Sequence, residues 1–109
     1  MTVKLANSPC SWGVSYPDAP GNPDPKKVFR EIAEAGYEFS ELGPYGFFQP
    51  DPQKILDFTE NLNLKIIGSF IFDNLHIESE QQRIKKTISK SCALLEKINS
   101  KVFVVIDHI

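Results

Sequence analysis

The feature that most constrains the fold of this 109-residue chain is an alternation of short apolar runs with amphipathic helical segments. Strands that are joined through helices must run parallel, and such crossovers are almost always right-handed. The pattern therefore predicts an α/β protein in the order β-α-β-α-β-α-β. We expect strands over 3–8, 37–42, 65–70 and 102–106, and helices over 25–35, 52–62 and 80–98.

The helix boundaries follow from local signals. Two Asp-Pro pairs, Asp24-Pro25 and Asp51-Pro52, are typical helix starts, because aspartate caps free amides and proline suits the first helical position. Gly36, Asn63 and the pair Asn99-Ser100 close the helices, and each is followed almost at once by the next strand. The connections from helix to strand are therefore very short.

The connections from strand to helix are long by comparison. The first covers 9–23 and contains four prolines and two glycines. In α/β proteins, elaborated loops at the carboxyl ends of the strands are where ligands bind. The sequence thus predicts which end of the sheet carries function before any motif is considered.

The length of the chain fits only part of the fold that this pattern suggests. A closed (β/α)8 barrel takes about 250 residues, so we expect residues 1–109 to form its N-terminal half. The run Val102–Ile106 has five consecutive apolar residues, which is typical of a strand covered on both faces. A four-stranded sheet with helices on one side would leave its inner face and two edges open.

Composition narrows the class of partner. The net charge is −2 and the sequence pI is about 5.6, which argues against nucleic acid or an anionic membrane as a ligand. No apolar run is long enough to span a membrane, and the N-terminus shows no signal-peptide pattern. Two cysteines, Cys10 and Cys92, are too few for a disulfide scaffold, and we expect Cys92 on the buried stripe of its helix. These observations favour a cytoplasmic location.

Three segments carry a resemblance to a known family. Residues 5–14 (LANSPCSWGV) are similar to the first strand and loop of inosose dehydratase-like proteins. Residues 32–44 (IAEAGYEFSELGP) look like a helix-to-strand junction of sugar phosphate isomerases and epimerases, and residues 67–70 (IGSF) fit the same pattern. The chain therefore resembles the N-terminal half of the xylose isomerase-like TIM-barrel family.

The resemblance implies an enzyme that acts on a small sugar or polyol. In this family a divalent metal (Mn, Mg, Co or Zn) binds carboxylates and a histidine from the later strands, and two glutamates move protons beside a carbonyl. Those strands lie outside the chain, so no metal ligand and no catalytic residue is assigned to it. The resemblance implies isomerisation, epimerisation or dehydration in the complete barrel, with little turnover by this half alone.

Three residues are predicted to bind substrate. Glu41 lies near the end of the second strand, where a carboxylate can accept hydrogen bonds from hydroxyls, although an ion pair or a loop cap is the simpler interpretation. Trp12 follows the first strand and can stack on a sugar ring or pack the loop. His108 ends the fourth strand beside Asp107, at a position where barrels place ligand-binding side chains.

Two further residues are weaker candidates. His76 lies in the loop after the third strand, where a single histidine is usually solvated, and its spacing to His108 matches no zinc motif. Cys10 has no partner base nearby in the sequence, which argues against a nucleophilic role.

Two other functions stay open at this level. A half-barrel could self-associate, as a homodimer, into a binding or structural module without catalysis. A metal-dependent nuclease of the apurinic endonuclease type would share the barrel, but the acidic pI counts against it.

Overall fold

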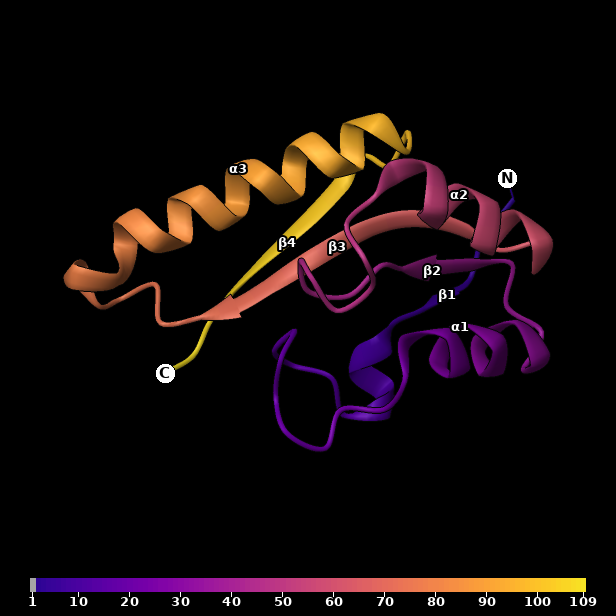
Figure 1. The fold of residues 1–109 in the computed structure, drawn as a ribbon, viewed down its shortest axis with the longest axis horizontal. Helices are drawn as coiled ribbons and strands as arrows, with labels where there is room; N and C mark the ends of the chain where they lie inside the picture. Colours follow the sequence, from indigo (N-terminus) through magenta and orange to yellow (C-terminus); the bar gives the residue numbers. More distant parts are fainter. Residues whose placement is uncertain (1) are drawn as a thin grey trace.

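The computed structural model describes residues 2–109 and contains a four-stranded parallel sheet (Figure 1). The strands are paired in chain order, β1-β2-β3-β4, and every pairing is parallel. Their bounds are β1 Ala6–Asn7, β2 Phe39–Glu41, β3 Lys65–Asp73 and β4 Val102–Asp107. The helices are α1 Pro25–Glu34, α2 Pro52–Asn61 and α3 Gln81–Lys97, with short 3-10 helices η1 Pro9–Trp12 and η2 Glu78–Glu80. The predicted α/β order and parallel sheet are confirmed.

The helix boundaries form by the capping chemistry that the sequence predicts. The Asp24 carboxylate accepts a hydrogen bond from the Lys27 amide at 3.2 Å, which caps α1. Asp51 accepts from the amides of Gln53 and Lys54 at 3.0 and 3.2 Å, which caps α2. Each bond satisfies an amide that has no partner within its own helix.

Left-handed residues reverse the chain after each helix. Gly36 follows α1 with φ +98°, while Asn63 and Asn99 follow α2 and α3 with φ of 52° and 58°. Glycine adopts this conformation without a steric penalty, and asparagine tolerates it better than other residues. This explains why the helix-to-strand turns are so short.

The hydrophobic core lies between the sheet and its helices. Because the strand order follows the chain and right-handed crossovers turn the same way, the three helices cover one face of the sheet. One continuous cluster joins residues from all three helical segments to the sheet: Val28, Phe29, Ile32, Ile55, Leu64, Ile66, Leu94, Leu95 and Ile98 are all buried in it. Figure 1 shows the carboxyl ends of the strands pointing toward the side on which the C-terminus lies.

The register of β3 and β4 separates two faces of the sheet. Residues paired across parallel strands share a face, and successive residues along a strand alternate between faces. Phe103, Val105 and Asp107 share the helix face, since Phe103 packs against the core cluster. The other face, called the open face here, carries Val102, Val104 and Ile106 of β4 with Gly68, Phe70 and Phe72 of β3. An irregularity between Ile66 and Gly68, which pair with the successive residues Ser40 and Glu41, interrupts the alternation and leaves Ile66 on the helix face.

Two expectations about the strands need correction. The strand predicted over 3–8 forms only at Ala6–Asn7, where β1 pairs with Phe39 and Ser40, and Val3 and Leu5 are exposed. The segment before Ala6 finds no pairing partner because β2 itself begins at Phe39. In contrast, β3 extends to Asp73, three residues beyond the prediction, because β4 pairs along its whole length.

The run 102–106 has the apolar composition of a strand covered on both faces, but it is exposed in this chain, as the expectation of an open inner face and open edges predicts. Val102 and Val105 are 54% and 50% exposed, and β4 is an edge strand of the sheet. Cys92 is also exposed, although the helical periodicity predicts it on the buried stripe of α3. Leu94 and Leu95 face the core instead, and Cys92 lies beside them in a hollow next to β4. None of the helices within residues 2–109 has the length and apolarity needed to cross a membrane.

Candidate functional site at the carboxyl edge of the sheet

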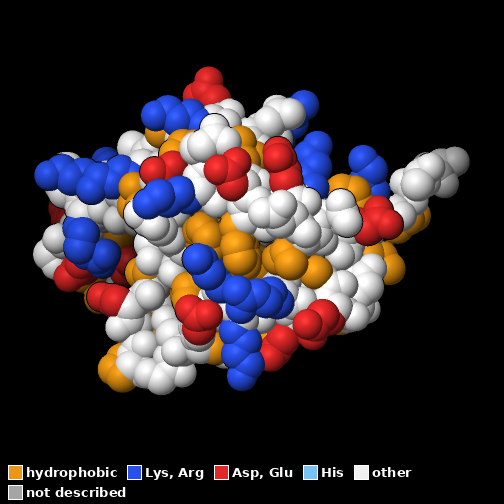
Figure 2. Space-filling model, turned by 45° about the vertical axis from the view of Figure 1, so that its right-hand side comes forward, with side chains coloured by type: hydrophobic (Ala, Val, Ile, Leu, Met, Phe, Trp, Pro, Cys, Tyr) orange, Lys and Arg blue, Asp and Glu red, His pale blue; other side chains and the backbone are white. Residues whose placement is uncertain are grey.

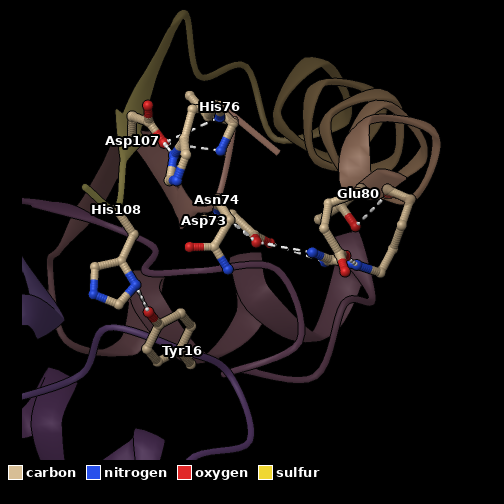
Figure 3. A network of polar contacts seen from close by, with 10 residues as sticks. Tyr16, Asp73, Asn74, His76, Glu80, Asp107 and His108 are labelled. Carbon is tan, nitrogen blue, oxygen red and sulfur yellow. Dashed lines mark hydrogen bonds and ion pairs between the residues drawn. The ribbon is translucent and has the colours of Figure 1, made fainter. Parts of the chain in front are cut away.

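An aromatic cluster lies on the open face, at the carboxyl ends of β3 and β4. The imidazole of His108 lies with its ring centroid 4.7 Å from that of Phe72, the next-to-last residue of β3. The Tyr16 ring lies 5.5 Å from the Phe72 ring, and its hydroxyl is 2.8 Å from Nδ1 of His108 (Figure 3). Residues 92 positions apart in the sequence therefore meet at one edge.

The loop and the strand ends hold these side chains in place. The side-chain amide of Asn22 donates to the Tyr16 carbonyl oxygen at 2.8 Å, which folds the 13–24 loop back on itself. The amide of His108 donates to the Asp73 carbonyl oxygen at 2.8 Å and so continues the β3–β4 pairing beyond β4. His108 is consequently tied to the sheet by its backbone, and its Nδ1 is engaged by Tyr16, while the residue as a whole is exposed.

A second histidine lies nearby on the helix-face side of β4. His76 Nδ1 is 2.9 Å from Oδ1 of Asp107, which also accepts from the Leu75 amide at 2.9 Å. The hydrogen bond from His76 lowers the pKa of the Asp107 carboxyl, so that this group is an anion at neutral pH. The sequence analysis left His76 as a weak candidate, and the structure pairs it with the other residue named beside His108.

Three further charged residues fix the loop between β3 and α3. Arg83 Nη1 and Nη2 donate to both oxygens of Asp73 at 2.9 and 2.8 Å, and its Nε donates to Glu80 at 2.8 Å. The Arg83 hydrogen bonds lower the pKa of Asp73, while the two carboxylates raise the pKa of Arg83. Two-pronged contacts of this kind fix orientation. This cluster orders the loop that carries His76.

The predicted site residues do not all converge. Glu41 pairs in register with Gly68, whose partner on β4 is Val102, so these three share the open face and line one hollow. His108 follows Val102 by six residues, which corresponds to about 20 Å along an extended strand. Glu41 and His108 therefore lie at different levels of the same face.

The Trp12 indole takes a packing position. Its Nε1 donates to a Glu31 carboxylate oxygen at 2.6 Å, and the ring packs against the core cluster beside α1. This contact ties η1 to α1. The geometry favours the interpretation of Trp12 as a loop anchor.

The remaining polar candidates form no larger site. Cys10 is exposed in η1. Within residues 2–109, no three His, Cys, Asp or Glu side chains converge in an arrangement that could hold a metal ion. The carboxylates of Asp73 and Asp107 are already hydrogen bonded to Arg83 and His76.

Sequence reasoning missed Tyr16 and Phe72. Tyr16 lies in a loop without periodicity, and no spacing connects it with His108. Phe72 lies beyond the predicted end of its strand. The signal that could have found Phe72 is the apolar run that continues through Ile71 and Phe72 to Asp73.

Fold and site together define the class as an α/β protein with a parallel sheet, covered by helices on one face and bearing an aromatic and histidine cluster at its carboxyl edge. No protein-family model matches this chain, and a comparison with curated proteins found no match to its sequence.

Proposed function

We propose that the chain forms the first half of a (β/α)8 barrel of the xylose isomerase-like type, and that its carboxyl edge helps to bind a small sugar or polyol. The sheet order, the parallel pairing and the helices on one face are compatible with half a barrel, which supports this proposal. The resemblance of residues 5–14 and 32–44 to sugar isomerases and epimerases supports the choice of substrate class.

The observation that carries this proposal is the cluster of Tyr16, Phe72 and His108 on the open face. Aromatic faces bind the C–H surface of sugar rings, and an imidazole nitrogen forms hydrogen bonds with hydroxyls. The cluster lies at the carboxyl ends of the strands, where α/β folds bind ligands. Glu41 presents a further hydrogen-bond acceptor lower on the same face.

In this proposal the chain binds and orients substrate, and turnover needs residues from further strands. A divalent metal (Mn, Mg, Co or Zn), held by those strands, would polarise the carbonyl beside which a proton is removed. In this proposal the residues of this half bind substrate, and no proton-transfer step is assigned to them. Their part is to hold hydroxyl groups at the barrel mouth.

The nuclease alternative finds less support. Asp73, Glu80 and Asp107 surround the carboxyl edge, and the net charge is −2. Figure 2 shows acidic and basic side chains mixed over the face it presents, without a broad basic groove for a phosphate backbone.

The first prediction tests sugar binding by nuclear magnetic resonance. We expect a panel of keto-sugars and polyols to shift the signals of Tyr16, Phe72 and His108, with dissociation constants of about 1–10 mM because the proposed contacts are few. His108→Ala should weaken this binding at least about fivefold, since it removes a hydrogen-bonding ring and opens the aromatic cluster.

A matched control is available at the same edge. His76→Ala removes an exposed histidine on the helix-face side and should leave sugar binding unchanged. Shifts spread evenly over the surface, or equal losses in the two variants, would argue against the proposed site.

A further inference from the structure

Helices α1 and α2 border a hollow that the sugar-binding proposal does not use. Its volume is about 350 Å³, and its lining mixes aromatic, basic, acidic and amide side chains: Lys26, Phe48, Lys54, Asp57, Phe58 and Asn61, among others. None of these lining residues belongs to a strand. Further strands of a barrel would extend the sheet beyond its edges β1 and β4, so they would not fill a space between α1 and α2.

Phenylalanine rings form the apolar part of this hollow, called the α1–α2 hollow here. The centroid of the Phe58 ring lies 5.5 Å from that of Phe48, which in turn lies 5.7 Å from that of Phe29. Phe29 and Phe48 are buried, whereas Phe58 is only partly buried. The stacked rings tie Phe58 to the hydrophobic core, and part of its surface remains available to a ligand.

Three basic side chains surround Phe58. Nζ of Lys26 and Cζ of Arg30 on α1 each lie 5.6 Å from the centroid of its ring. Lys54 lines the hollow from α2, and its Nζ donates to Oε1 of Gln49 at 3.5 Å. A cation held over an aromatic ring is already partly ordered, so it loses less conformational freedom when it pairs with an anion.

These three cations have no carboxylate partner in the part of the chain that the structure describes, residues 2–109. None of the ion pairs found there includes Lys26, Arg30 or Lys54. By contrast, Lys27, which is adjacent to Lys26 on α1, lies 3.9 Å from Glu31. The positive charge around Phe58 is therefore left for an external group.

The acidic residues close to the hollow are engaged by other groups. Asp57, which belongs to the lining, accepts a hydrogen bond from the side-chain amide of Gln53 at 2.8 Å. Asp24 and Asp51 cap the two helices and accept hydrogen bonds from backbone amides. The hollow thus carries a local excess of positive charge on a chain whose net charge is −2.

We infer that the α1–α2 hollow binds an acidic peptide segment of a partner protein, with an apolar side chain against Phe58 and carboxylates paired with Arg30 and Lys54. Charge complementarity selects an acidic partner, and cations on both helices select a segment that crosses from one helix to the other. Lys26, Lys54 and Asp57 are exposed, so the hollow is too open to enclose a small ligand, which favours a peptide. This inference is independent of the sugar-binding proposal, which uses the carboxyl edge of the sheet.

A titration followed by nuclear magnetic resonance tests the inference. The probe is a synthetic peptide of about seven residues, in which a central phenylalanine is flanked by glutamates on both sides. We expect it to shift the amide signals of Arg30, Lys54 and Phe58, with a dissociation constant of about 0.1–1 mM at low salt. Raising the salt from about 20 mM to about 300 mM should weaken binding at least about threefold, because exposed charges are screened. A peptide with glutamine in place of every glutamate should bind at least about fivefold more weakly.

Charge reversal on the two helices supplies the variants. Arg30→Glu and Lys54→Glu should each weaken binding of the glutamate peptide at least about fivefold, since each replaces an attraction with a repulsion. Lys85→Glu makes the matching change at an exposed position of α3 and should change binding less than about twofold. All three side chains are exposed, so we expect these variants to keep the fold, which their amide spectra verify.

Three outcomes would overturn the inference. Equal losses in Lys54→Glu and Lys85→Glu would show an attraction that depends only on overall charge. Equal binding of the glutamine peptide would show that the cations around Phe58 take no part in recognition. Displacement of the peptide by an equal concentration of phenyl phosphate, or of a short oligothymidylate, would assign the hollow to a small anion or to nucleic acid instead.

Discussion

At the residue scale, the charged side chains of this protein order loops more than they fill its interior. Asp73 is bound by both terminal nitrogens of Arg83, and Asp107 is bound by His76 and by a backbone amide. Within residues 2–109, every buried side-chain nitrogen or oxygen has a hydrogen-bond partner. At the carboxyl edge, the charged side chains are therefore hydrogen bonded to one another or to the backbone. The exposed His108 lies beside them on the open face.

The Asp73–Arg83 pair gives a prediction about pH. The Arg83 hydrogen bonds hold the folded-state pKa of Asp73 below its ordinary value of 3.8, so the pair stabilises the fold above pH 3.8 and loses this contribution as the pH falls through the folded-state value. Since Arg83 is 53% exposed, solvent screening limits the contribution to about 1 kcal/mol. Asp73→Asn should therefore lower the free energy of unfolding by about 1 kcal/mol at pH 7 and flatten its pH dependence below about pH 4.

Urea unfolding between pH 3 and pH 7 measures both effects. Asp18→Asn, a change at an exposed loop position, serves as the control. A pH dependence in Asp73→Asn that matches the unaltered chain would show that the pair contributes nothing to stability.

At the element scale, the pairing of β3 with β4 organises the open face. β3 pairs with β4 at six successive positions, from Gly68–Val102 to Asp73–Asp107. This register places His108 and the Asp107 partner of His76 beside the end of β3. Gly68 is the first β3 residue of the β3–β4 ladder. The position requires glycine, because a Cβ atom there would overlap the carbonyl oxygen of Val102. The close approach of the two strands therefore depends on glycine.

Gly68→Ala should accordingly destabilise the chain by about 2–4 kcal/mol, because the backbone of β4 has to move. Gly21→Ala is the matched control. Gly21 has φ +87° and open space around it, so the same change should cost only about 1 kcal/mol of backbone strain. Urea unfolding compares the two, and a Gly68→Ala cost no larger than the control would refute the proposed contact.

At the scale of the whole molecule, the helix face of the sheet is covered more completely than the open face. The helix face carries the core, whereas Val102, Val104 and Ile106 are 54%, 39% and 40% exposed on the open face. Burial of such residues is worth about 25 cal/mol for each Å² of apolar surface. A second copy of the chain, or further strands of a barrel, would gain this free energy by covering the face.

We therefore expect the chain to self-associate, as a homodimer or larger species, through the open face. Sedimentation equilibrium should give an average mass above 12.3 kDa that rises with concentration between about 10 and 500 µM. Val104→Lys should reduce this association because it places a charge on the apolar face. Glu34→Lys, on the exposed surface of α1, adds a lysine elsewhere and should have a smaller effect. A monomer at all concentrations would contradict the prediction.

The sequence by itself determined the order of elements, the parallel sheet and the helix boundaries. These features depend on local chemistry: Asp24 and Asp51 cap helices, Gly36 reverses the chain, and apolar residues repeat with the period of a helix or a strand. Only the tertiary structure decided which residues meet at the carboxyl edge. Tyr16, Phe72 and His108 come together because parallel pairing brings distant strand ends to one edge, and no spacing in the sequence encodes that contact. For the same reason, the exposure of Cys92 and β4 depends on what packs beside them and not on their own apolar character.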